Sequence, residues 1–173
     1  VMEEFPTFVT HLECSYTGKT YPADQLHGLS EAGKPLLVRY DLDALGKAIN
    51  KEDLIGRLPE LWRYREFLPV RRSKNVVRLG ELMTPLLPAN KLQQEYGCGE
   101  ILIKDEGRLP TGSFKARGLT MAVSMAKELG VECMAMPTNG NAGAALAAYC
   151  SRANIETYVF CPEDTPRVNV EEI

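Results

Sequence analysis

The sequence predicts an α/β fold for residues 76–173, in which parallel strands are joined by crossover helices. Short apolar segments there alternate with longer segments of helical periodicity, in the order strand–helix–strand–helix. Each predicted strand also ends in a turn rich in glycine, proline or asparagine before the next helix begins. Residues 1–75 lack this alternation. They are therefore predicted to form a separate N-terminal segment of short strands and interrupted helices.

Glycine and proline interrupt the N-terminal segment repeatedly up to about residue 40. Residues 35–41 (PLLVRYD) predict a strand, after which Asp41 or Asp43 can cap a short helix. Residues 43–70 are helical in pattern but interrupted, because Pro59 cannot continue a helix that it enters. An aromatic and leucine group in this stretch is expected to be packing surface, and ligand stacking is the minor alternative. The group consists of Leu61, Trp62, Tyr64, Phe67 and Leu68.

The elements of the second segment follow from periodicity. Strands are predicted at 101–106, 131–137 and 155–162, and helices at 114–130 and 141–153. Gly130 is a natural helix stop, and Thr165 with Pro166 is predicted to open another helix. Because that helix has only begun at the end of the sequence, the last strand would lack cover on one face. We therefore expect this sequence to be the N-terminal part of a larger catalytic core.

Composition and charge exclude several classes of protein. The formal net charge is -3 with a pI near 5.5, whereas nucleic-acid binding requires a basic face. No apolar run approaches the ~20 residues of a membrane span, and the N-terminus has acids where a signal peptide has basic residues. A cytoplasmic location is therefore expected. The 5 cysteines are widely spaced without a CxxC pair, which favours reduced thiols and predicts no metal site.

The first motif with chemical potential is PTGSFKARG at residues 110–118, where a strand gives way to a helix. Gly112 permits a tight turn, and Ser113 can cap the helix. Lys115 then falls in the first turn, where the helix dipole disfavours a cation, so its amine should be free more readily for Schiff-base chemistry. A solvated lysine beside a capping serine explains the same motif equally well.

The second motif is PTNGNAG at residues 137–143, again between a strand and a helix. It presents hydroxyl, amide and backbone N–H groups, a combination suited to binding a carboxylate. A common turn before a capped helix is the alternative. Two such turns on adjacent crossovers, one with an amine and one with amides, favour a functional site.

These residues identify a resemblance. DEGRLPTGSFKARG followed by PTNGNAGAALAAY resembles the tryptophan-synthase-β-like, fold type II pyridoxal-phosphate enzymes, and within them the threonine synthases most of all. TPLLPANKL at 84–92 and PEDTP at 162–166 fit the same family, so the resemblance covers residues 76–173. Before residue 76 it is looser: LECSYTGKTY is similar to a cysteine-containing N-terminal segment of several members, but Thr17 stands at the second cysteine. The segment is therefore predicted to bind no structural zinc.

The resemblance implies a role for each matching residue. Lys115 would bind pyridoxal 5′-phosphate as a Schiff base, and Asn141 would contact the 3′ oxygen of the cofactor. The residues matching the substrate-carboxylate loop are Thr138, Asn139, Gly140 and Ala142. The family's phosphate cup and its partner for the pyridine nitrogen lie further along the chain. Residues 1–173 alone are therefore expected to be inactive.

The implied reaction converts O-phospho-L-homoserine and water to L-threonine and phosphate, with a small amino-acid substrate as partner and a possible homo-oligomer. A serine/threonine dehydratase or another β-eliminating member of the family is the nearest alternative. A non-catalytic, amino-acid-binding or regulatory paralogue is an alternative of another class. Arg117 could meet a phosphate group, but on a helix an arginine is more typical of a surface charge.

Overall fold

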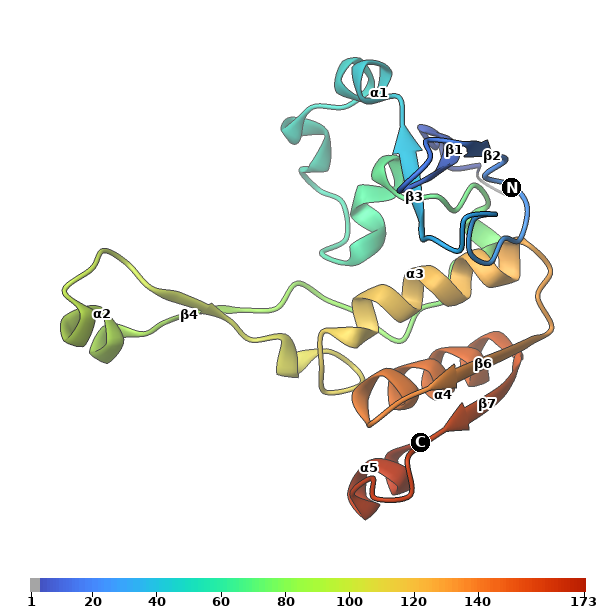
Figure 1. Ribbon diagram of the computed structural model, residues 1–173. Helices are drawn as coiled ribbons and strands as arrows, with labels where there is room; N and C mark the ends of the chain where they lie inside the picture. Colours follow the sequence, from blue (N-terminus) through green and yellow to red (C-terminus); the bar gives the residue numbers. More distant parts are fainter. Residues whose placement is uncertain (1–3) are drawn as a thin grey trace.

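The computed structural model describes residues 4–173, beginning with a small antiparallel sheet (Figure 1). Its strands lie in the order β2-β1-β3. Their bounds are β1 (Val9–Cys14), β2 (Thr20–Tyr21) and β3 (Leu36–Tyr40). Helix α1 (Leu42–Ala48) follows, and Asp41 caps it by accepting the N–H of Ala44 at 2.8 Å. The predicted strand and its capping aspartate are both confirmed.

The stretch after α1 contains three short 3₁₀ helices, which confirms the predicted interruption. They are η1 (Lys51–Leu54), η2 (Leu61–Phe67) and η3 (Ser73–Asn75). Trp62 of η2 is 2% exposed and packs with Phe5 and Val70 in a small hydrophobic cluster. Tyr64 and Phe67 remain 37% and 43% exposed, so only part of the predicted aromatic group is packing surface.

A narrow arm extends away from the rest of the chain (Figure 1). It consists of β4 (Leu86–Pro88), α2 (Asn90–Tyr96) and β5 (Leu102–Lys104). The prediction that residues 101–106 contribute a parallel strand is wrong, because β5 pairs antiparallel with β4. All residues of both strands are exposed. A strand with no buried face has no apolar pattern to direct it to a sheet, so the neighbour joined to it by α2 becomes its partner.

The predicted α/β unit is confirmed from residue 115 onward. Helices α3 (Lys115–Glu128) and α4 (Asn141–Ala153) pack together, and β6 (Cys133–Pro137) pairs parallel with β7 (Glu156–Phe160). Helix α5 (Arg167–Glu172) follows β7. Helix α4 contacts β7, whereas the opposite sheet face leaves Tyr158 and Phe160 more than half exposed. Parallel strands are usually covered on both faces, so the exposure of this apolar face is unusual for a parallel pair.

The main core lies between α3 and α4 and includes Val123, Leu146 and Tyr149, each 0% exposed. Thr120 and Ser124 are also 0% exposed, and both form hydrogen bonds with the backbone of Val77. Thr120 Oγ1 donates to the carbonyl of Val77 at 2.6 Å, and Ser124 Oγ accepts the N–H of Val77 at 2.8 Å. Two buried hydroxyls on α3 therefore fix the chain that leads out of the N-terminal segment.

Two predicted helix caps are wrong. Phe114 occupies the N-cap position of α3, and the buried hydroxyl of Ser113 has no hydrogen-bond partner within residues 4–173. Pro166 occupies the N-cap position of α5, so Thr165 lies one residue too early to cap it. Gly130 follows α3 with φ +72°, which confirms it as the stop. Within the described residues, no helix is long and apolar enough to cross a membrane.

Candidate active site

The two predicted motifs meet in one open cleft of about 320 Å³. Lys115 reaches it from the first turn of α3. The loop between β6 and α4 supplies the other predicted residues. These are Thr138, Asn139, Gly140, Asn141 and Ala142. All six residues singled out from the sequence therefore line the same cleft, because the carboxyl end of a parallel strand and the starts of the crossover helices lie at one edge of a sheet.

A tight turn delivers Lys115 to the cleft. Gly112 adopts φ +64°, a conformation that favours glycine, and its N–H donates to the carbonyl of Leu109 at 2.8 Å. The Lys115 Nζ atom lies 4.4 Å from the centre of the Phe114 ring. The hydroxyls of Thr111 and Ser113, on the same turn, are buried without a partner within the described residues. The turn thus brings an amine and two unsatisfied hydroxyls to the start of α3.

Thr138 closes the loop at the other side of the cleft. Its Oγ1 atom accepts the N–H groups of Gly140 at 3.1 Å and Gly143 at 3.0 Å, and it lies 3.2 Å from the Gly140 carbonyl, to which it donates. The hydroxyl is therefore engaged inside the loop. The first N–H groups of a helix have no intrahelical acceptor, and those of Asn141 and Ala142 make no backbone hydrogen bond within the described residues. The Asn141 side chain is exposed.

Asn169 of α5 is a cleft residue that the sequence reasoning missed. Its side-chain amide donates to the carbonyl of Asn139 at 3.1 Å, and a Cβ atom on Gly140 would come within 2.9 Å of it. Gly140 adopts φ +155°, so glycine is favoured there on two grounds. The sequence signal was the predicted helix after PEDTP, but nothing in its pattern indicates that α5 folds back on this loop.

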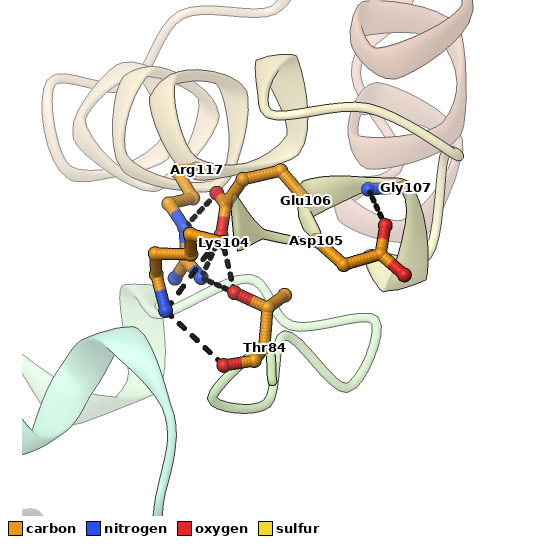
Figure 2. A network of polar contacts seen from close by, with 6 residues as sticks. All are labelled: Thr84, Lys104, Asp105, Glu106, Gly107 and Arg117. Atoms are coloured by element: carbon orange, nitrogen blue, oxygen red, sulfur yellow. Dashed lines mark hydrogen bonds and ion pairs between the residues drawn. The ribbon is translucent and has the colours of Figure 1, made fainter. Parts of the chain in front are cut away.

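A polar network outside the cleft holds the start of α3 (Figure 2). Arg117, two residues after Lys115, binds Glu106 through both Nε and Nη2, the latter at 2.9 Å. Thr84 donates to the same carboxylate, and Lys104 Nζ lies 4.0 Å from it. The expectation that Arg117 is a surface charge is therefore wrong: it forms a two-point ion pair whose two side chains are 28% and 22% exposed.

The network determines the charge state of Glu106. The two-point hydrogen bond from the Arg117 guanidinium lowers the pKa of the Glu106 carboxyl to about 2, against partial burial, and the Thr84 hydroxyl adds to the effect. A second buried carboxylate, Glu81, accepts hydrogen bonds from the Tyr149 hydroxyl and the Leu79 N–H. Burial, together with that bond, raises the pKa of Tyr149. Glu106 is therefore ionised, and Tyr149 protonated, near neutral pH.

Comparison with known proteins identifies the family. The sequence profile described as pyridoxal-phosphate dependent enzyme matches residues 77–173, more than half of the chain. The chain belongs to this family. Its fold is thus the fold type II α/β architecture, and pyridoxal phosphate is its cofactor.

Three curated relatives are all described as threonine synthase. The protein from Methanocaldococcus jannaschii is 41% identical over 87% of this chain, and that from Methanosarcina acetivorans is 37% identical over 88%. The protein from Halalkalibacterium halodurans is 46% identical over 60% of this chain. The matched regions cover 37%, 37% and 29% of the respective relatives, so this chain spans about a third of their length.

The residues of the cleft fit this cofactor chemically. A primary amine is present for a covalent link, and N–H groups at the start of α4 can donate to an anionic oxygen.

In the N-terminal cysteine segment, the Cys14 thiol lies within hydrogen-bonding distance of two neighbouring polar groups. The Cys14 Sγ atom lies 3.0 Å from Ser30 Oγ and 3.4 Å from the Thr17 N–H. Within residues 4–173 no group of three or more histidine, cysteine, aspartate or glutamate side chains could hold a metal ion.

Proposed function

We propose that this chain supplies the cofactor lysine and the substrate-carboxylate loop of a threonine synthase. The reaction would convert O-phospho-L-homoserine and water to L-threonine and phosphate. One observation carries the proposal: Lys115 and residues 138–142 line the same cleft. The similarity of most of the chain to proteins described as threonine synthase supports the choice of reaction.

In this proposal Lys115 first holds the cofactor covalently. When it is free, the Lys115 amine would move protons at the α and β carbons of the substrate. Bound pyridoxal phosphate supplies the electron sink for the charge that develops at the α carbon. The short turn at Gly112 and the Arg117–Glu106 pair would keep the amine at the cleft throughout.

The loop between β6 and α4 would position the substrate and the cofactor ring. The free N–H groups at the start of α4 would receive the substrate carboxylate, together with Asn139, Gly140 and Ala142. Thr138 would contribute by shaping the loop, since its hydroxyl already bonds Gly140 and Gly143. The exposed Asn141 amide would contact the 3′ oxygen of the cofactor.

The wider organisation of the protein is also part of the proposal. Residues 1–75 would form an N-terminal segment, and residues 76–173 the first part of the catalytic core. The acidic net charge supports a protein that binds no nucleic acid. A cytoplasmic location and a homo-oligomer complete the proposal.

The test uses the full-length protein loaded with pyridoxal phosphate. Incubation with O-phospho-L-homoserine should release phosphate and form threonine, whereas incubation with threonine should give little 2-oxobutyrate. The reverse pattern would identify a serine/threonine dehydratase. Binding of amino acids without turnover of either substrate would identify a non-catalytic paralogue.

A further inference from the structure

A second cavity, of about 660 Å³, lies at the opposite ends of α3 and α4 from the candidate active site. Its walls are η2 and the segments on either side of it, together with Lys127 in the last turn of α3 and Arg152 in the last turn of α4. Helix α3 has 14 residues, which corresponds to a length of roughly 20 Å. The cavity is therefore separate from the cleft that Lys115 lines.

The cavity is strongly basic, although the chain as a whole carries a net charge of -3. Its cationic lining residues are Arg57, Arg63, Arg65, Arg78, Lys127 and Arg152. Two carboxylates offset part of this charge. Glu66 lies 2.8 Å from Arg57 and 3.6 Å from Arg65, and Glu60 lies 3.1 Å from Arg78. An excess of about four positive charges remains over these two acids.

Three of the cations have no carboxylate within 4 Å among residues 4–173. Arg63 instead donates to the carbonyl of Leu54 at 2.7 Å, and Lys127 to the carbonyl of Lys74 at 3.1 Å. The dipoles of α3 and α4 explain why Lys127 and Arg152 lie at helix C-termini. They do not explain why Arg63, a residue of η2, lies at this cavity.

The same wall is short of hydrogen-bond acceptors. The Nε atoms of Arg63 and Arg65 and the indole Nε1 of Trp62 are buried without a hydrogen-bond partner within the described residues, although Arg65 Nε lies 3.6 Å from Glu66. All three atoms are donors, and Trp62 is only 2% exposed. Buried donors that lack acceptors are costly, so this wall carries more donors than its own acceptors satisfy.

We propose that this cavity binds a phosphorylated small molecule with more than one negative charge. Guanidinium groups bind phosphate oxygens through two parallel N–H groups, and η2 with its flanking segments places four of them at this cavity. Ligand pockets in proteins typically measure about 300–1,000 Å³, so the space suits a diphosphate or a phosphate ester with an organic part rather than a single phosphate ion. The site is independent of the proposed catalytic function.

The test is calorimetric titration of the full-length protein, loaded with pyridoxal phosphate, with inorganic pyrophosphate at constant ionic strength. We expect saturable binding that Arg63→Gln weakens about tenfold or more, as expected for loss of a charged hydrogen bond. Arg152 is exposed on the helix side of the cavity, so Arg152→Gln should weaken binding several-fold without disturbing the fold. Lys91→Gln on the exposed surface of α2 removes the same charge elsewhere and should change the affinity less than twofold.

Several outcomes would overturn the proposal. Equal weakening by Lys91→Gln and Arg152→Gln would show general charge attraction, and binding unchanged by both cavity variants would place the anion elsewhere. Absence of binding in the full-length protein would mean that another part of the protein fills the cavity. Thermal melting of each variant separates lost binding from lost folding. If Arg63→Gln unfolds, Arg152→Gln together with Lys127→Gln still decides the question.

Discussion

Lys115 and Asn141 both line the cleft, from the first positions of α3 and α4. Their chemistry gives them unequal weight in the proposed site. The lysine amine can form a covalent link and transfer protons, whereas the asparagine amide can only form hydrogen bonds. Loss of the lysine should therefore abolish both cofactor attachment and turnover. Loss of the asparagine should leave the cofactor bound and reduce turnover.

Borohydride reduction of the full-length protein with pyridoxal phosphate should label Lys115. Lys115 lines the cleft at the end of the turn that Gly112 permits, whereas Lys104 and Lys127 lie in the arm and at the far end of α3. Peptide mapping after reduction measures the position of the label. A label on Lys104 or Lys127 with none on Lys115 would refute the assignment.

Asn141→Ala should retain the cofactor with a shifted visible absorption spectrum and a turnover reduced about tenfold to 150-fold. A hydrogen bond to a charged oxygen contributes roughly 1.5–3 kcal/mol, which corresponds to that range. Absorption spectra and steady-state rates of the full-length variant measure the effect. An unchanged spectrum and rate would mean that Asn141 only starts α4.

At the scale of elements, the start of α3 is held by contacts behind the cleft. Arg117 joins it to Glu106 of the 3₁₀ helix η4 (Glu106–Arg108). The same carboxylate accepts a hydrogen bond from Thr84 and lies near Lys104, both in nearby segments of this chain (Figure 2). The start of α4 is held by close packing. Gly143, in its first turn, lies against Thr138 and Val159. The start of α3 is thus fixed by residues outside the cleft, and the start of α4 by Val159 and by Thr138, which itself lines the cleft.

Glu106→Gln should destabilise the full-length protein by about 1–3 kcal/mol, because it removes the charge from a two-point, partly buried pair. Arg108→Gln is the matched control: it breaks an exposed pair with Asp105 and should cost less than about 1 kcal/mol. Denaturant unfolding measures both. Equal effects of the two substitutions would contradict a special role for the Arg117–Glu106 pair.

Gly143→Ala should destabilise the protein by about 1–3 kcal/mol through overpacking. The added Cβ atom would come within 2.4 Å of Thr138 Cγ2 and 2.8 Å of Val159 Cγ1. Gly118→Ala in α3 is the control, since nothing lies within 4 Å of its added Cβ atom and alanine favours the helix by up to about 1 kcal/mol. Opposite signs for the two substitutions in thermal melting are expected; a stabilising Gly143→Ala would refute the packing argument.

At the scale of the whole molecule, α3 and α4 connect two sites of different chemistry. Their N-terminal ends present the amine and the free N–H groups of the cleft, and their C-terminal ends present Lys127 and Arg152 to the basic cavity. The Glu106 network joins this helix pair to the arm and to the chain leaving the N-terminal segment. Its ionisation should therefore affect the stability of the whole structure.

Acid should weaken the native state between about pH 4.5 and pH 2 through Glu106. The pKa of its carboxyl falls from 4.5 to about 2 on folding, chiefly because of the Arg117 guanidinium. A lowered pKa contributes stability that is fully present above the unfolded-state value and is lost as the pH falls towards the folded-state value. Thermal melting across this range should show a steeper decline for the unmodified protein than for Glu106→Gln. Parallel curves would show that the pair does not couple to folding.

The sequence by itself determined the helices and strands with strong patterns and the residues that form the candidate site. Residues 141–153 have regular small and apolar spacing after an Asn-Gly turn, so α4 was predicted with its observed bounds. Residues 138–142 were found because their motif lies between a parallel strand and a helix, and Lys115 because a glycine turn precedes its helix. The packing of α3 against α4 brings the two helix starts together. Helix periodicity and the turn motifs are local patterns, so a single segment of the sequence is sufficient to reveal them.

Only the tertiary structure decided what depends on distant partners. The antiparallel pairing of β5, the ion pair of Arg117 and the approach of Asn169 to the cleft each join segments whose residues carry no pattern that identifies the other member. The basic cavity is the same kind of feature, because its cations come from η2 and from the ends of two helices. Pairing, ionisation and cavity formation depend on three-dimensional proximity and on exclusion of water, which are properties of the packed chain and not of any segment of the sequence.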